Sequence, residues 1–437
     1  MNSKYRNIVA VILMSSIIIA CNRVEDDLFN ESAAIRVNKS IEMTNDLLTS
    51  VDNGWVFEYF PNSTSVGVTY LVKFPTSSQV TMATVNQYVT TYKEANSYWR
   101  VINDMGPVLT FDTYNDVFHL YSAPTLPSTG ESDGKGLEGD YEFLIVDKSA
   151  DIITLKGKKR GTISILRKLS STQSWIGYFD LINNMNVVIF GKTNARLRLV
   201  ADNNELYTLK NGSSHIFSLV PNGGDEIDDA TDSPFIVTDY GIRMSSPISI
   251  GEKWAQNFKL SDDKNELICT DNGVNAKIVS MPSTDIFTDI INARKYMIFK
   301  YADENMSETI KSAYTTINNI VVSKTRKLEY IGFTYNKDYG ISLSVYSTKG
   351  TSKIEGFLNF STTKLNDTNV RLKFNGFVGK FDTNGKTYYD TYALSGLVAL
   401  LEDDFTISIR DNALSASVLR FTSITDTTKW FDLILKN

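Results

Sequence analysis

The chain has 437 residues, of which 42% are hydrophobic, 22% charged and 11% aromatic, so it can build a sizeable core and is not expected to be disordered. Its formal net charge of −6 repels phosphate backbones, which argues against nucleic acid as a partner. With two histidines and two cysteines, a zinc site would have to rely on carboxylates.

Residues 1–20 have the layout of a secretory signal peptide. Lys4 and Arg6 precede an apolar run from Ile8 to Ala20. The run is shorter than the roughly 20 residues that a helix needs to cross a bilayer, and a small residue closes it. We therefore expect this segment to be removed and not to be a permanent membrane span.

The sequence Ile18-Ile19-Ala20-Cys21 resembles the lipobox of bacterial lipoproteins, whose cysteine is acylated and becomes the first mature residue. Each buried methylene contributes about 0.8 kcal/mol, and stable anchoring takes two chains or signals. Several acyl chains on Cys21 would therefore hold the protein on a membrane. The alternative is an ordinary signal peptide that happens to have a cysteine beside its cleavage site.

Residues 21–33 form an acidic tether in this interpretation. The stretch Arg23 to Asp27 resembles the export signal of Bacteroidota lipoproteins that are displayed on the cell surface. Asn22 does not resemble the aspartate that retains many lipoproteins in the inner membrane. These resemblances imply a lipid-anchored outer-membrane protein that faces the cell exterior, whereas a purely solvated tether is the alternative.

Three segments with a 3.6-residue apolar period predict amphipathic helices, at residues 34–48, 175–185 and 306–317. Between them, short alternating stretches bounded by turn residues predict strands. Successive strands are separated by turns and not by helices, which favours antiparallel pairing. The sequence thus predicts a mainly β (α+β) protein of antiparallel β-meander sandwich or barrel-like units, each introduced by an amphipathic helix.

We predict three such units, at residues 34–170, 171–282 and 283–437, because turn-forming residues interrupt the pattern at 170–174 and 282–285. The ends of the units look alike, each with a phenylalanine strand, a polar turn and two further strands. An internal triplication and three unrelated meanders both fit this likeness. Asn384-Gly385 lies between two strand-like stretches and predicts a tight hairpin turn.

The candidate ligand-binding residues are Tyr114, Asn115 and His119, which we expect to gather in a strand-turn-strand segment. If His119 met the acids Asp140 and Glu142, they would form a polar ligand site. The alternative is that these residues satisfy backbone groups and hold a turn in place.

Aromatic residues offer a second candidate, because three tyrosines and Trp99 lie close together in residues 88–99 and would suit a platform for sugar rings. Core packing is the alternative for them. The other tryptophans considered all fall in apolar patterns that predict core packing, namely Trp55, Trp175, Trp254 and Trp430.

The search for other chemistry is mostly negative. Residues 221–232 offer many oxygen ligands for calcium but fit no EF-hand spacing, so a solvated loop is the alternative. Cys269 is expected to be a buried free thiol. No zinc-helix or nucleophile-elbow motif is present, and we predict no metal site, no cofactor and no catalytic residue.

Several stretches resemble a Bacteroidota lipoprotein family, DUF4302, a domain of unknown function. They include "GPVLTFDTYNDVFHLYSAP", "GDYEF" and "LKGKKRG", together with an early "NGWVFEYFP" and a late "GIRMSSPISI". The resemblance spans nearly the whole mature chain. It implies a cell-envelope lipoprotein, often encoded beside outer-membrane nutrient-uptake proteins, and it supplies no catalytic residues.

Two functions follow from these observations. The first is a non-catalytic surface binding or accessory protein of an outer-membrane uptake system, with a glycan or a peptide as ligand and the uptake proteins as partners. The second is a glycosidase-like surface hydrolase, which needs two carboxylates about 5 to 9.5 Å apart in a cleft. The first is favoured because no catalytic constellation emerges from the sequence.

Overall fold

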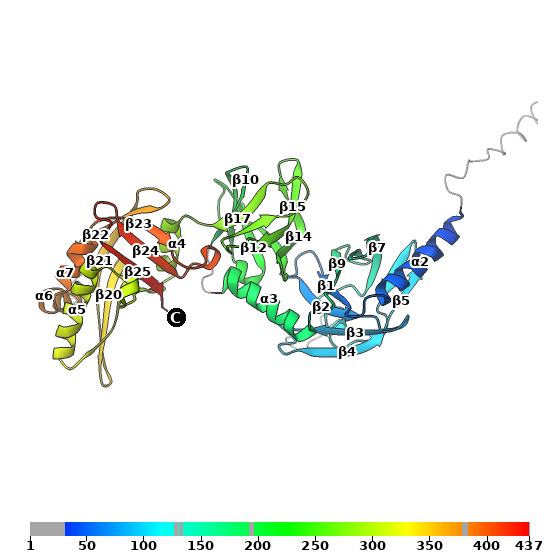
Figure 1. The fold of residues 1–437 in the computed structure, drawn as a ribbon, viewed down its shortest axis with the longest axis horizontal. Coiled ribbons are helices and arrows are strands. Elements are labelled where there is room, and N and C mark those ends of the chain that lie inside the picture. The colour runs from blue at the N-terminus through cyan, green and yellow to red at the C-terminus, as the bar shows by residue number, and fades with distance from the viewer. Residues whose placement is uncertain (1–30, 126–129, 131–133, 192–195, 378–382, 437) are drawn as a thin grey trace, which may run out of the picture.

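The computed structural model describes residues 31–125, 130, 134–191, 196–377 and 383–436. Cys21, the predicted signal peptide and most of the predicted tether lie outside the described residues. No helix in the described part is long and apolar enough to cross a membrane. Three β units follow one another along the long axis of the molecule (Figure 1).

The first unit is a nine-stranded antiparallel sheet preceded by helix α2 (Ala33–Thr49). Ser32 caps the helix by accepting a hydrogen bond from the backbone N–H of Ile35. The strands are β1 (Trp55–Tyr59), β2 (Val68–Lys73), β3 (Gln79–Thr84), β4 (Lys93–Tyr98), β5 (Arg100–Asn103), β6 (Pro107–Thr110), β7 (Glu142–Lys148), β8 (Ile152–Gly157) and β9 (Ile163–Lys168), with the 3₁₀ turn η2 (His119–Tyr121) between β6 and β7.

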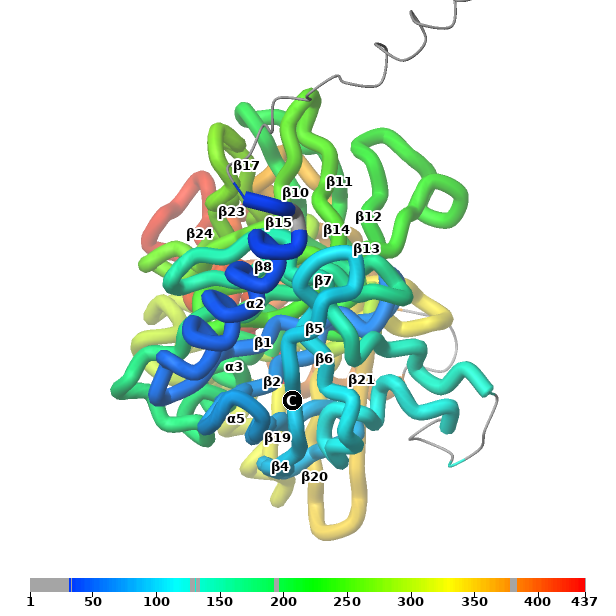
Figure 2. The backbone as a smooth tube through the Cα atoms, turned by 90° about the vertical axis from the view of Figure 1, so that its right-hand side faces the viewer, coloured from blue at the N-terminus to red at the C-terminus, as the bar shows by residue number. Residues whose placement is uncertain are grey.

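The two edges of this sheet, β4 and β5, are consecutive in the sequence, with Trp99 between them. The backbone N–H of Trp99 donates to the carbonyl of Ser78 at 2.8 Å, and its buried indole packs against Phe74. The sheet is therefore open between β4 and β5. Helix α2 packs on β5 and β6, on the side that faces the viewer in Figure 2.

The second unit is a closed eight-stranded barrel that follows helix α3 (Trp175–Phe190). Buried and half-exposed side chains alternate along several of its strands, as a strand with one face toward a core requires. In β10, Leu197, Leu199 and Ala201 are buried, while the residues between them are half-exposed. Its strands are β10 (Leu197–Ala201), β11 (Asn204–Lys210), β12 (Ile216–Pro221), β13 (Thr231–Val237), β14 (Gly241–Ile250), β15 (Lys253–Leu260), β16 (Glu266–Cys269) and β17 (Ala276–Ser280), with η3 (Gly212–Ser214).

The third unit is another closed eight-stranded barrel, with four α-helices among its described residues. Its helices are α4 (Ser283–Asn292), α5 (Glu308–Ser323), α6 (Thr383–Thr391) and α7 (Leu394–Leu401), with η4 (Asp303–Asn305) and η5 (Ala413–Ser415). Its strands are β18 (Met297–Phe299), β19 (Lys327–Asn336), β20 (Gly340–Lys349), β21 (Ser352–Lys364), β22 (Asn369–Gly376), β23 (Asp404–Ile409), β24 (Val418–Ser423) and β25 (Trp430–Leu435).

In all three units the last strand pairs with the first. Trp55 of β1 lies opposite Lys168 of β9, Leu197 opposite Ser280, and Met297 opposite Leu435. The sequence stretches that look alike at the ends of the units correspond to the last three strands of each unit. The final strand of each stretch is the one that pairs with the first strand. The prediction of a mainly antiparallel β protein with barrel-like units is confirmed. The residue boundaries proposed for separate domains stay a prediction.

Two local predictions need correction. Asn384-Gly385 forms no hairpin turn but lies in the first turn of α6. The Asn384 side chain donates to the carbonyl of Glu355, and a Cβ on Gly356 would lie 2.6 Å from the Gly385 nitrogen, so the helix is held by close packing on β21. The third predicted helix exists as α5, but it follows β18, so α4 is the helix that introduces this unit.

Trp254 is a further correction, because its side chain is 60% exposed and does not pack in a core. The adjacent Ala255 is fully buried in the barrel core, and successive side chains of a strand point to opposite faces. Trp55, by contrast, is fully buried as predicted.

The two barrels share a core contact. Leu414 of η5, a connection of the second barrel, is 1% exposed and packs in the hydrophobic core of the first barrel. Beside it, Asn412 Nδ2 and Ser415 Oγ both donate to the carbonyl of Val188 in α3, at 2.8 and 3.0 Å. The second barrel therefore completes the packing of the first.

Candidate functional site

The sheet and the first barrel are joined by a buried ion pair. Glu58 of β1 and Arg243 of β14 are both almost fully buried, and their Oε2 and Nε atoms lie 2.6 Å apart. Arg243 also donates to the backbone carbonyl of Glu58, and its guanidinium lies 4.9 Å from the centre of the Phe60 ring. Glu58 lies in the middle of an otherwise apolar strand, so this pairing explains how a carboxylate is tolerated there.

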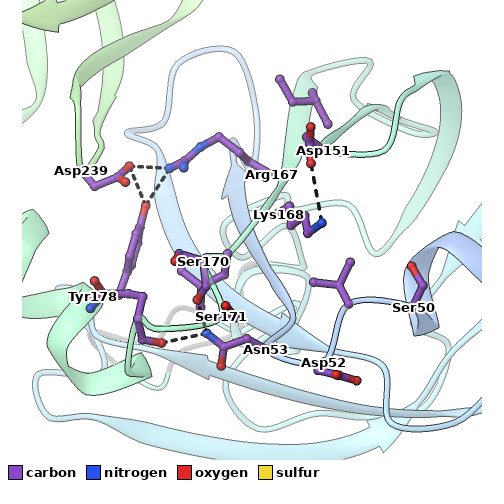
Figure 3. A pocket seen from close by; sticks show the side chains of 14 residues that line it. Ser50, Asp52, Asn53, Asp151, Arg167, Lys168, Ser170, Ser171, Tyr178 and Asp239 are labelled. Carbon is purple, nitrogen blue, oxygen red and sulfur yellow. Dashed lines mark hydrogen bonds and ion pairs between the residues drawn. The ribbon is translucent and has the colours of Figure 1, made fainter.

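A second, less deeply buried charged group adjoins the ion pair, and its members Arg167, Tyr178 and Asp239 are drawn in Figure 3. Arg167 at the end of β9 lies 3.6 Å from Glu58 and also pairs with Asp239, in the turn between β13 and β14. The Tyr178 hydroxyl of α3 lies 3.0 Å from both partners, the Arg167 guanidinium and the Asp239 carboxylate. Burial disfavours the charge on Arg167, but Tyr178, Asp239 and Glu58 outweigh it and raise its pKa. Burial and Asp239 raise the pKa of Tyr178, so the phenol stays protonated.

Arg167, Tyr178 and Asp239 form one wall of a cavity of about 740 Å³ at the junction of the two units. Its other walls come from the turn after α2, from the β7–β8 turn and from the segment between β9 and α3. Asn53 holds this last segment by donating to the carbonyls of Ser170 and Gln173, at 2.6 and 2.8 Å. The cavity therefore has a rigid frame, and its size lies in the range of small-molecule sites.

Many side chains of the cavity lining are polar, and they carry both signs of charge. Three carboxylates and two cations face it, together with hydroxyl and amide groups. Lys168 and Asp151, near the entrance, are loosely paired at 3.8 Å and well exposed, so both are accessible to a ligand. Such a lining suits a polar ligand with several hydrogen-bonding groups.

The structure brings the predicted residues Tyr114, Asn115 and His119 together at the η2 turn, and none of them lines the cavity. Asn115 is buried, and its backbone N–H donates to His119 Nδ1 at 3.0 Å. The Asn115 side chain accepts from the backbone of Val117 and Phe118, so it holds the turn. Burial lowers the pKa of His119, against hydrogen bonds that raise it.

Tyr114 is the exposed member of the predicted set. Its side chain is 65% exposed, and its ring centre lies 5.6 Å from that of His119, whose ring centre is also 5.5 Å from that of Tyr141. The carboxylates expected beside His119 bind elsewhere: Asp140 accepts from the backbone of the β8–β9 turn, and Glu142 pairs with Lys158. Of the aromatic residues considered for a sugar platform, Tyr98 is exposed, whereas Trp99 is buried in the core.

A hydrolytic site would need a carboxyl group whose pKa is raised so that it can donate a proton. The pKa of the Asp140 carboxyl is raised by burial, against hydrogen bonds from the backbone of Arg160 and Lys159 that lower it. Asp140 does not line the cavity.

The remaining candidates are accounted for by local contacts. In the acidic loop, Asp225 and Asp229 accept from backbone N–H groups and Glu226 pairs with Lys210, and the described residues contain no metal-like cluster of three or more His, Cys, Asp or Glu. Cys269 is a buried free thiol, as predicted, and burial raises its pKa to about 11.

The ion pair of Glu58 and Arg243 was not predicted from the sequence. The two residues are separated by 185 positions, so no local pattern links them. A signal existed nevertheless, since each is a single charge inside an apolar strand, in "WVFEYF" and "GIRM". Charged side chains are almost never buried without a partner.

Comparison with protein families finds a match to the model described as "Domain of unknown function (DUF4302)" over residues 25–262, more than half of the chain. The matched segment includes every residue that lines the cavity. It ends after β15, before the two strands that close the first barrel.

Comparison with curated proteins finds no match. Among solved structures, transferrin binding protein B from serogroup B Neisseria meningitidis aligns at 9% sequence identity and a TM-score of 0.13. The alignment covers 85% of this chain and 66% of that one, just under two thirds of its length. A likeness this low carries no argument about fold or function.

Proposed function

Since the chain belongs to the DUF4302 family, we propose that it is a Bacteroidota lipoprotein of the outer membrane that faces the cell exterior and binds a small polar ligand without transforming it. In this role it serves an outer-membrane nutrient-uptake system as a binding or accessory protein. Its partners are then the membrane, through acyl chains on Cys21, the uptake proteins, and a glycan fragment or a short peptide.

The observation that supports binding is the polar cavity between the sheet and the first barrel. Its frame is held by contacts that do not involve a ligand, so little ordering would oppose binding. Hydroxyl and amide groups suit the hydroxyls of a sugar, and carboxylates beside cations suit the termini of a peptide.

Blocking the cavity is expected to abolish ligand capture. A glycan and peptide array probed with residues 22–437 would identify the ligand. Ser171→Trp places an indole at the cavity and should weaken binding of that ligand at least about tenfold, which corresponds to roughly 1.4 kcal/mol. Titration calorimetry measures the change.

The matched control is Thr172→Trp, which adds nearly the same bulk at the next exposed residue, outside the cavity lining. It should bind like the unchanged chain. Equal binding by both variants would place the ligand elsewhere. Turnover of the ligand that is lost when Asp151 or Asp52 is replaced would instead support the hydrolase.

Acylation of Cys21 is expected to be required for membrane attachment, because the acyl chains supply the apolar surface that enters the bilayer. Mass spectrometry of the native protein should find a lipid-modified Cys21 at the amino terminus, and Cys21→Ser should not be recovered in this form. Protease added to intact cells should digest the described units. An unmodified thiol at residue 21 contradicts the anchor, and a fully protected chain contradicts the exterior location.

A further inference from the structure

A second cavity, of about 430 Å³, lies at the same junction and differs from the first in the charge of its lining. The sheet contributes the segments around β2 and the end of β3, helix α3 contributes Phe179 and Ile182, and the first barrel contributes β13 and the η3 turn. Gly67 holds the two units together here. A Cβ on this glycine would lie 2.4 Å from Cβ of Ile236, so only glycine permits the contact.

The second cavity is lined mainly by apolar side chains. Among them, Val68, Ile236 and Val237 are buried, and Phe179 and Ile182 of α3 are half-buried. None of its lining residues is Asp, Glu, Lys or Arg. A charged ligand would therefore lose its hydration without gaining a partner charge, which costs several kcal/mol.

The polar side chains of this lining carry no acidic or basic charge of Asp, Glu, Lys or Arg, and they are Thr69, Asn86, Gln87, Tyr121, Ser213, Ser214 and His215. The Tyr121 side chain is 3% exposed, and its hydroxyl makes no hydrogen bond of good geometry, although Gln87 lies close enough to affect its pKa. A buried hydroxyl without a partner is uncommon and costs free energy. His215 is held in one orientation, because its Nε2 lies 2.8 Å from Asn186 Oδ1 and its ring packs beside Phe235.

We propose that this second cavity binds an uncharged, largely apolar small molecule with a hydrogen-bond acceptor, to which the Tyr121 hydroxyl donates. The ligand would satisfy the phenol and bury its apolar surface against the walls from α3 and β13. Burial lowers the pKa of His215, so this ring is neutral at pH 7 and matches a neutral ligand. This site is distinct from the polar cavity, and the two share no lining residue.

The probe for the test is prodan, an uncharged naphthalene ketone whose fluorescence shifts to shorter wavelength in an apolar site. Residues 22–437 should bind prodan at one site with such a shift. Tyr121→Phe keeps the shape of the side chain and removes the donor, so it should weaken binding about two- to tenfold. Ile182→Trp fills the cavity and should abolish the fluorescence shift.

Leu181→Trp is the matched control, since it adds the same ring on the same helix at an exposed residue outside the lining. It should bind prodan like the unchanged chain, as should Ser171→Trp, which separates this proposal from that for the polar cavity. Far-ultraviolet circular dichroism and the thermal midpoint show whether each variant is folded. Absence of a prodan site in the unchanged chain, or full binding by folded Ile182→Trp, would refute the proposal.

Discussion

Arg243→Ala is expected to lower the free energy of unfolding by about 3–5 kcal/mol, because it leaves the carboxylate of Glu58 buried without its closest partner. Arg167 lies 3.6 Å from the other carboxylate oxygen and is too far away to replace the lost hydrogen bonds. Since Glu58 belongs to the sheet and Arg243 to the first barrel, the loss should appear in the earliest transition of urea unfolding, followed by tryptophan fluorescence.

The control for this prediction is Lys327→Ala, which removes an exposed partner of Glu329 and should change stability by less than about 1 kcal/mol. The double variant Glu58→Leu with Arg243→Met should be more stable than Arg243→Ala, because it leaves no unpaired charge in the junction. If Arg243→Ala and Lys327→Ala had equal effects, the buried pair would not hold the two units together.

Leu414→Ala is expected to cost about 2–5 kcal/mol and to destabilise the first barrel, although residue 414 belongs to a connection of the second. The reason is the cavity that the lost side chain leaves in the core of the first barrel. Cys269 reports on this core, because its thiol is buried there and reacts with a disulfide reagent only when the barrel opens. Its reaction in residues 22–437 should become faster in the variant.

Ile424→Ala serves as the comparison for Leu414→Ala, since it removes the same number of carbon atoms from a side chain that is 44% exposed. Its effect on the reaction of Cys269 should be small. An unchanged rate in Leu414→Ala would mean that the second barrel does not contribute to the core of the first. In that case the hydrogen bonds from Asn412 and Ser415 would be the main link.

The candidate site shows where sequence patterns stop being informative. Tyr114, Asn115 and His119 were predicted to gather, and they do, because they lie within one turn. Their function as a ligand site stays a prediction, since Asn115 and His119 mainly hold that turn. The polar cavity combines Asn53, Arg167 and Asp239, which belong to three different segments, and no local pattern joins them.

The sequence by itself determined the elements of this protein. Residues such as Leu197 and Leu199 alternate with half-exposed neighbours, and Tyr178, Ile182 and Met185 recur with a helical period, so strand or helix follows from which side chains avoid water. Tertiary structure decided that Asn384-Gly385 lies in a helix and that Glu58 meets Arg243. It also decided that β17 and β25 close two barrels, whereas β4 and β5 do not pair with each other. Periodicity acts over a few residues, whereas closure, buried charge pairs and cavities depend on contacts between residues far apart in the chain, which no short window of sequence contains.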